Sequence, residues 1–302
     1  MADATLAAAP LSNTREIARA IWAEKAKRAR RAALLKHLFL IGCSLIMIYP
    51  LLWMVASSLK PNNQIFGDLS LWPSEFRWDN YTSGWNGMSV SFSTFFANSL
   101  FVTVLSVIGN VLSCSFAAYA FARLEFTGKN IWFALMMMTL MIPYHVVLIP
   151  QYLTFLNLGW VDTYLPLIVP QFLAGDAFFI FLMVQFFRQL PRELDEAAMI
   201  DGCSAFKIYW AIIMPLSIPA IATAAIFSFI WTWDDFLGPL VYLNDVKDYT
   251  VPLALRMFNS QDSVTQYGQM FAMSVLSILP IFVFFIIFQR LIIRGIAMSG
   301  LK

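Results

Sequence analysis

The sequence predicts an all-α integral membrane protein with six transmembrane helices. Of the 302 residues, 60% are apolar and 13% are charged, whereas a soluble domain typically has about 45–50% apolar and about 25% charged residues. A helix needs about 20 apolar residues to cross a bilayer, and six segments meet this requirement. They lack the alternating polarity of the strands of a membrane barrel. Because backbone in lipid must satisfy its own hydrogen bonds, each segment is expected to be a helix.

The six spans divide the chain into a tail, residues 1–37, and a membrane domain, residues 38–302. The tail is too long for the charged region of a cleaved signal peptide, and its residues 15–36 are expected to form a basic helix. This helix is expected to lie on anionic headgroups, with contact to a partner protein as the alternative. The predicted spans cover approximately 38–59, 95–121, 131–153, 164–187, 208–232 and 270–293, and prolines in the third and fourth (Pro143, Pro150, Pro166 and Pro170) predict kinks.

The distribution of lysine and arginine predicts the orientation. Sixteen of them lie in the tail, in loops 122–130 and 188–207, and at the C-terminal end. Four lie in the other connecting segments, namely Lys60, Arg77, Lys247 and Arg256. Positively charged loops stay in the cytoplasm. Both termini and loop 188–207 are therefore expected on the cytoplasmic side.

The composition argues against several kinds of site. The three cysteines have no CxxC spacing, and the chain has two histidines, so a disulfide scaffold or a zinc site is not expected. No loop gathers the residues of a Ser/His/Asp set, which disfavours a membrane enzyme. The nucleotide-binding motif GxxxxGK(S/T) is absent from the sequence.

The stretch ELDEAAMIDG, residues 193–202, carries four carboxylates in a mostly apolar chain. Acidic residues follow Pro191, where the helix dipole favours negative charge. Gly202 is placed to end this helix, and Ser204 to cap a second one. We expect Leu194, Ala197, Ala198 and Asp201 to share a face that docks on a basic partner surface. The alternative is a helix lying on headgroups, which repulsion from anionic lipid disfavours.

Several motifs resemble those of a known family. Glu196-Ala197-Ala198, Gly202 and the stretch IIMPLSIP at 212–219 resemble the EAA loop of the inner-membrane permeases of ABC importers. Other stretches resemble the carbohydrate-uptake branch, in particular the shorter, six-span subunit of maltose-type pairs: NSLFVT (98–103), AAYAFARLEFTGK (117–129), MIPYHVVLIPQY (141–152), FFRQLPRELDEAAMIDG (186–202) and WTWDDFLGPLVYL (231–243). The resemblance covers residues 38–302.

The resemblance implies a type I ABC importer permease fold in the bacterial inner membrane. Its expected partners are a homologous second permease, two ATPase subunits that bind ATP and Mg²⁺, and a periplasmic or lipid-anchored solute-binding protein that delivers a di- or oligosaccharide. A cofactor bound to this chain itself is not expected. The ATPase-coupling residues are expected to be Glu193, Glu196, Ala197, Ala198, Asp201 and Gly202. A polyol phosphate substrate is the alternative within this machinery; a secondary transporter or a membrane scaffold lies outside it.

Other residues are candidates for the substrate pathway. Asp176 lies near the middle of a predicted span, where acids usually face a cavity or a partner; irregular backbone around Gly175 or packing on the second permease is the alternative. Gln171 is a similar candidate. Trp231 and Trp233, at the outer end of span five, are expected either to anchor the helix in the interface or to stack on a sugar ring.

The resemblance implies two further contacts with partner proteins. The acidic side chains of residues 233–269 indicate that this segment forms a solvated docking surface or loop, and the resemblance implies that Asp245, Lys247 and Asp248 contact the binding protein. The C-terminal residues Ser299, Gly300 and Lys302 are expected to contact the ATPase.

Overall fold

The computed structural model describes residues 11–67, 70–258 and 266–299, and every regular element within these ranges is helical. The all-α prediction is therefore confirmed for the described part of the chain. Contacts divide the chain into two units, Met1–Ala56 and Ser57–Lys302. The predicted boundary at residue 37 rests on composition, whereas the boundary between the units follows the end of the first helix.

In its described residues the first unit is formed by helix α1, Leu11–Ser57, whose last residue belongs to the second unit; the helix runs through the basic tail and the first predicted span without a break. The segment Arg30–Ser57 is long and apolar enough to cross a membrane. The expected helix over residues 15–36 is confirmed, and Pro50 is accommodated inside the helix.

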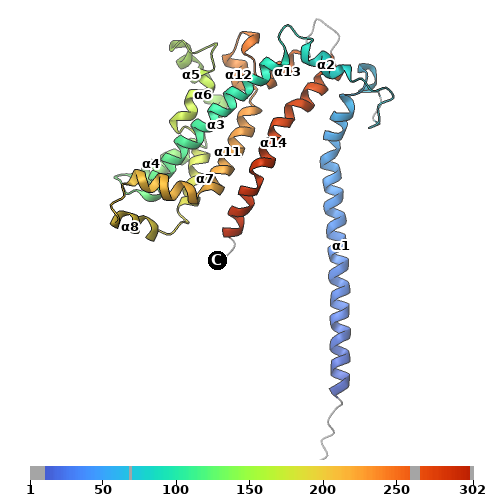
Figure 1. Ribbon diagram of the computed structural model, residues 1–302, viewed down its shortest axis with the longest axis vertical. Coiled ribbons are helices and arrows are strands. Elements are labelled where there is room, and N and C mark those ends of the chain that lie inside the picture. The colour runs from blue at the N-terminus through green and yellow to red at the C-terminus, as the bar shows by residue number, and fades with distance from the viewer. Residues whose placement is uncertain (1–10, 68–69, 259–265, 300–302) are drawn as a thin grey trace, which may run out of the picture. The chain divides into compact units, whose positions relative to one another are not determined.

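The second unit is built around the long helix α3, Phe92–Arg123 (Figure 1). It packs against α7, Ala177–Phe187, and α11, Ile218–Trp233, and α11 packs in turn against α14, Tyr267–Ser299. The shorter elements are η1 (Asn62–Gln64), α2 (Asp79–Asn86), α4 (Lys129–Thr139), α5 (Tyr144–Asn157), α6 (Leu165–Ile168), η2 (Val169–Leu173), α8 (Glu193–Ile200), α9 (Ala205–Ile208), the π-helix η3 (Tyr209–Ile213), α10 (Met214–Leu216), α12 (Leu237–Tyr242), η4 (Val246–Asp248) and α13 (Val251–Met257).

Close packing in this unit depends on a small residue on α3. A Cβ atom at Gly109 would lie 2.5 Å from the ring of Phe172, so the two segments can approach this closely only with glycine there. Asn110, one residue further on, donates from Nδ2 to Oε1 of Gln171 at 3.2 Å. These contacts hold η2 against the middle of α3.

Two of the six predicted spans are sharply bent. Within the described residues, four segments are long and apolar enough to cross a membrane (Arg30–Ser57, Phe92–Arg123, Leu165–Phe187 and Tyr267–Leu291), and two further spans result if each bent pair counts as one. The α4–α5 pair bends by 98°, and residues 205–216 bend by 79° from α11. The prediction of a kink at Pro143 is confirmed, because this residue immediately precedes α5. The span predicted over 208–232 is such a bent pair, because the chain turns at Ser217 and Pro219.

The outer segment is more ordered than the predicted solvated loop. Within residues 233–258 the chain forms α12, η4 and α13, and Val251, Leu253 and Ala254 are buried. That part of the loop prediction was wrong, because these apolar side chains pack against the helices below despite the acidic residues between them. Residues 259–265 lie outside the described residues.

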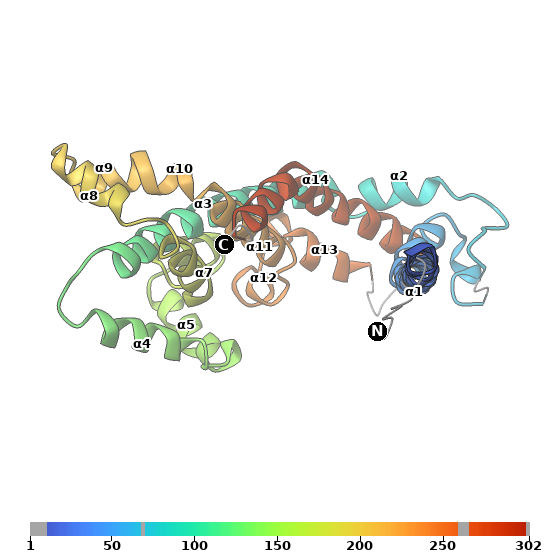
Figure 2. The same cartoon turned by 90° about the horizontal axis from the view of Figure 1, so that it is seen from below.

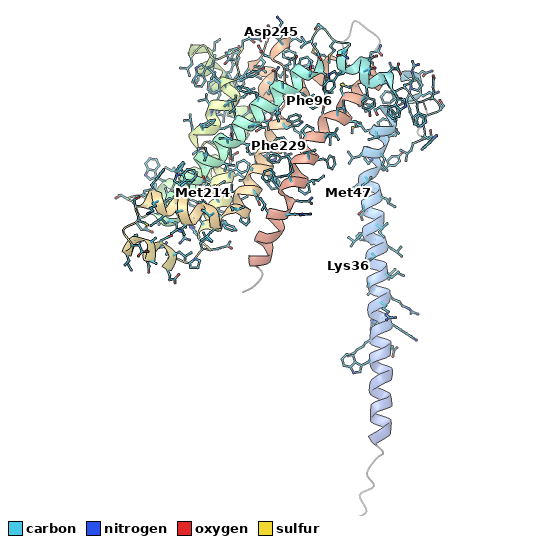
Figure 3. All side chains as sticks on the ribbon, viewed as in Figure 1. Lys36, Met47, Phe96, Met214, Phe229 and Asp245 are labelled. Atoms are coloured by element: carbon cyan, nitrogen blue, oxygen red, sulfur yellow. The ribbon has the colours of Figure 1, made fainter. Side chains whose placement is uncertain are left out.

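The second unit has two distinct ends. Figure 3 places Asp245 at one end and Met214 at the other. Helices α8 and α9 lie beside α10 at the end marked by Met214 (Figure 2). The acidic segment and the outer segment are therefore separated by the length of the helices between them.

Candidate functional site

The acidic segment forms the predicted helix, turn and second helix. Helix α8 carries three acidic residues in its first turn, Glu193, Asp195 and Glu196. It ends in a Schellman motif, in which Cys203 N donates to Ala198 O at 2.9 Å and Gly202 N to Met199 O at 3.0 Å. Gly202 has a φ of +75°, which L-residues rarely adopt. Ser204 Oγ then accepts from Lys207 N and caps α9.

Helix α8 has an exposed face and a buried face. The exposed residues include Glu193, Glu196, Ala197, Asp201 and Gly202, together with the apolar side chains Met199 and Ile200. Ala198 is buried with 6% of its surface exposed, and it belongs to the inner core. The prediction that both alanines offer their side chains to a partner was therefore wrong for Ala198. This small side chain instead lets α8 approach its own core.

The buried face of α8 is attached to the end of α3. Asp195 Oδ2 lies 3.1 Å from Nη1 of Arg123, whose side chain is 2% exposed. The same guanidinium donates from Nη2 to the carbonyl oxygen of Leu190 at 2.8 Å. One guanidinium therefore bridges two points of the segment, the Asp195 carboxylate and the Leu190 carbonyl, and this holds the exposed acidic face of α8 in a defined direction relative to α3.

A cavity of about 700 Å³ lies within the second unit. Its lining combines hydroxyl, amide and carboxylate groups with aromatic rings; the polar side chains are Ser99, Thr103, Asn110, Thr139, Tyr144, Gln151, Gln171, Asp176, Ser228, Thr232, Asp235, Tyr242 and Thr250, and the aromatic ones include Phe155, Phe179 and Trp231. Pockets of about 300–1,000 Å³ with a few converging polar groups are typical of small-ligand sites. The cavity therefore has the size and the chemistry to receive a polar organic molecule.

The cavity brings together three of the four predicted pathway residues. Gln171 lines it from η2, Asp176 from the break between η2 and α7, and Trp231 from α11. Asp176 is the N-cap of α7, and its Oδ1 accepts from Phe178 N at 3.0 Å. The helix break around Gly175 explains how a carboxylate is accommodated here, because the free N–H groups of α7 bind it.

Trp233 does not line the cavity. Only 2% of its surface is exposed, its ring stacks on Phe229, and its Nε1 donates to the carbonyl oxygen of Ser277 at 3.0 Å. The expectation that it reaches substrate or the interface was wrong, because two positions along a helix turn the side chain to the opposite face. Trp231, by contrast, is 49% exposed and packs on Phe178 and Phe179.

The cavity also contains residues that the sequence did not single out. Tyr144, Gln151, Asp235 and Tyr242 lie on its wall. Asp235 Oδ1 accepts from Gly238 N at 3.0 Å, and burial raises the pKa of its carboxyl, an effect that the N–H groups of Gly238 and Leu237 partly oppose. The sequence placed Asp235 in a solvated loop; the adjoining pattern Leu237-Gly238-Pro239, which begins a short helix, was the available signal.

The predicted outer contact residues are attached to the fold rather than protruding from it. Asp245 caps η4, Lys247 O accepts from Asn98 Nδ2 at 2.7 Å, and Asp248 Oδ1 accepts from the hydroxyl of Tyr164 at 3.4 Å. Asp245 and Lys247 remain exposed. At the other predicted contact, Ser299 ends α14, while Gly300 and Lys302 lie outside the described residues.

Comparison with known proteins gives several independent matches. Residues 109–298 match the family described as the binding-protein-dependent transport system inner membrane component. The probable ABC transporter permease protein YurM of Bacillus subtilis is 34% identical over 265 residues, which cover 87% of each chain. The arabinooligosaccharides transport system permease protein AraQ of Halalkalibacterium halodurans is 32% identical over 285 residues, covering 91% of this chain and 99% of the relative.

Further matches extend this picture. The sn-glycerol-3-phosphate transport system permease protein UgpE of Yersinia pestis is 31% identical over 269 residues, covering 87% of this chain and 95% of its own. A solved structure of a bacterial ABC transporter that imports the acidic polysaccharide alginate has the same fold, with a TM-score of 0.76 over 86% of this chain and 96% of that one at 22% identity. The chain belongs to the family of inner-membrane components of binding-protein-dependent transport systems.

Proposed function

We propose that this chain is the permease subunit of an ABC importer that forms, with a second homologous permease, the pathway for uptake of a di- or oligosaccharide. The observation that carries the proposal is the cavity, whose lining combines hydroxyl, amide and carboxylate groups with aromatic rings. A sugar can match both kinds of group, because the hydroxyl groups at the edge of its ring form hydrogen bonds and the C–H groups on its faces pack against aromatic rings. Relatives named for oligosaccharide uptake support the same class of substrate.

The charge of the cavity favours a carbohydrate over a polyol phosphate. Two carboxylates, Asp176 and Asp235, line it, and none of the described lining residues is a lysine, arginine or histidine. Phosphate is normally bound by arginine or lysine or by a helix N-terminus. The N-terminus of α7 lines the cavity and could have bound a phosphate, but the Asp176 carboxylate already occupies it. The wall contributed by this chain therefore disfavours a phosphorylated substrate such as glycerol phosphate.

The exposed face of α8 is the proposed docking surface for an ATPase subunit. It combines Glu193 and Glu196 with the exposed apolar side chains Met199 and Ile200. Such a face fits a groove with a basic rim and an apolar floor. ATP and Mg²⁺ would bind to the two ATPase subunits, since the sequence lacks the nucleotide-binding motif.

The proposed orientation places α8 and both termini in the cytoplasm, following the excess of lysine and arginine on that side. The opposite end, with exposed Asp245 and Lys247 beside Asp248, would then face the solute-binding protein. The C-terminal residues Ser299, Gly300 and Lys302 remain a proposed second contact with the ATPase.

Reconstitution tests the proposal directly. The chain would be placed in vesicles with its partner permease, its ATPase subunits and its binding protein, and uptake of labelled maltose, arabino-oligosaccharides, diacetylchitobiose and glycerol 3-phosphate would be measured. We expect ATP-dependent uptake of one of the sugars that requires the binding protein. Uptake of glycerol phosphate alone would contradict the substrate class, and uptake by this chain alone on an ion gradient would contradict the importer.

The two tryptophans are expected to respond differently to replacement by alanine. Trp233→Ala removes a buried ring and should lower the free energy of unfolding by about 3–5 kcal/mol. Trp231→Ala should leave thermal stability close to that of the parent and lower uptake, because its ring lines the cavity. Thermal unfolding of the purified complex and uptake in vesicles measure the two effects. The assignment fails if Trp231→Ala transports normally or if Trp233→Ala is as stable as the parent.

Asp176→Asn separates a substrate contact from a helix cap. Asparagine caps a helix about as well as aspartate, so the bond to Phe178 N is retained and assembly should be normal. A hydrogen bond to a charged group contributes about 1.5–3 kcal/mol, so loss of the carboxylate should reduce uptake at low substrate concentration about tenfold or more. Asp176→Ala, which also loses the cap, is the comparison. Parental uptake by Asp176→Asn would leave only the capping role.

A further inference from the structure

We propose that Ser115, Tyr119 and Arg123 form a polar ladder that transmits movement of the coupling segment, residues 190–209, to α3 and through it to the cavity. The inference rests on the proposed docking of α8 on an ATPase subunit and adds the route that the movement takes inside this chain. The three residues are positioning residues, because they contact neither substrate nor nucleotide.

The three side chains share one face of α3. They are spaced four residues apart, so they lie one above another along the helix. Each contacts the coupling segment at a different point: Ser115 Oγ lies 2.7 Å from the hydroxyl of Tyr209, and the Tyr119 hydroxyl donates to the carbonyl oxygen of Ala205 at 3.0 Å. Arg123 binds the Asp195 carboxylate and the Leu190 carbonyl oxygen at 3.1 and 2.8 Å. The ladder therefore contacts the coupling segment before α8, within α8 and α9, and after α9.

Burial makes these contacts directional and strong. Ser115 is fully buried, and Tyr119, Tyr209 and Arg123 are almost fully buried. Hydrogen bonds gain strength in a low-dielectric interior, and their geometry fixes the register of the two partners. Apolar contacts are non-directional and would let α8 slide along α3. Stacking of Phe116 on Tyr209, with ring centroids 4.5 Å apart, supports the middle of the ladder.

Helix α3 is a stiffer route to the cavity than the chain that leads from the coupling segment to α11. It is a single α-helix from Phe92 to Arg123 with no proline, and its Ser99, Thr103 and Asn110 line the cavity. The covalent route from the coupling segment passes first through the π-helix η3 and then through the 79° bend at Ser217. Both irregularities allow the segment to move without displacing α11. A push on α8 would therefore reach the cavity wall more directly through α3 than through α11.

The first test replaces one residue of the ladder in the reconstituted complex. Tyr119→Phe removes the hydroxyl that donates to Ala205 and keeps the ring. We expect binding-protein-stimulated ATP hydrolysis to persist while uptake per ATP hydrolysed falls about three- to tenfold, the factor expected for losing one hydrogen bond. Tyr81→Phe is the matched control, because it removes a hydroxyl contact of 2.8 Å to Ser58 in the outer half of the unit; it should retain the parental ratio.

The second test separates coupling from stability. The double variant Arg123→Met with Asp195→Leu replaces the buried ion pair by apolar side chains, which often preserves or increases stability. We expect a complex that assembles and unfolds at or above the parental temperature, yet has a lower uptake per ATP than the parent. Arg123→Lys, which keeps the charge beside Asp195, should recover part of the ratio.

The outcomes distinguish the ladder from the proposed function. If the parental complex shows no ATP-driven uptake, the proposed function fails. If the parent transports and both Tyr119→Phe and the double variant keep its uptake per ATP, the ladder is overturned and the proposed function stands. If uptake per ATP in the variants falls only in proportion to lost thermal stability, the contacts are structural and the ladder is also overturned.

Discussion

Glu196→Lys is expected to abolish stimulation of ATP hydrolysis by the binding protein while leaving the permease folded. Glu196 is exposed on α8, so its replacement removes no buried contact. Replacing the glutamate by a lysine brings like charges together in the proposed basic groove, which costs several kcal/mol of docking free energy. We therefore expect stimulated ATP hydrolysis and uptake to fall about 100-fold or more. The ATPase rate of the reconstituted complex with and without binding protein measures this effect.

A charge reversal elsewhere provides the control. Glu75 is exposed like Glu196. Its one described ion pair, with Arg77 at 4.0 Å, is exposed to solvent and contributes little to the free energy of unfolding. Glu75→Lys changes the net charge by the same amount and should hydrolyse ATP at the parental rate. Equal losses in both variants would point to a general effect of charge, and parental activity in Glu196→Lys would exclude α8 as the docking surface.

Gly202→Val is expected to uncouple the importer through the backbone alone. A Cβ atom at this position would meet nothing within 4 Å, but the φ of +75° is strained for any L-residue and most for a β-branched one. The strain is about 1–2 kcal/mol, and relieving it requires the turn after α8 to open. We expect stimulated ATP hydrolysis to fall about tenfold, because the acidic face would no longer be held in its docking direction.

Gly202→Asn is the matched comparison. Asparagine adopts left-handed backbone conformations more readily than other residues with a Cβ atom, so this variant should retain most of the stimulation. If the asparagine and valine variants are equally impaired, the side chain itself obstructs the partner, and the backbone explanation is wrong.

Local features of the coupling segment were predictable from the sequence. The acids of the first turn, the glycine in the left-handed conformation and the capping Ser204 each act within a few residues, so α8, the turn and α9 appear where predicted. The six apolar segments were equally clear, because the length of an apolar run is a local property.

Other features depend on residues that are distant in sequence. Ala198 faces inward because Arg123, more than 70 positions earlier, holds the neighbouring Asp195. The cavity gathers Gln171, Trp231 and Asp235 from separate elements, and its wall is complete only when α3 has packed against both α7 and α11. Apolar content alone cannot reveal a sharp bend, because both arms of each bent pair are apolar; the prolines predicted the bend at Pro143, but the bend at Ser217 was not predicted.

The central claim is that the outward face of α8 lies in an ATPase groove, and site-directed cross-linking tests it most directly. Starting from a Cys203→Ser background, a cysteine would be placed at Ala197, which is exposed, or at Ala198, which is buried, and a second one in the groove of the ATPase. The account predicts a cross-link from position 197, dependent on nucleotide, and none from position 198. No cross-link from position 197, or equal cross-linking from both, would contradict it.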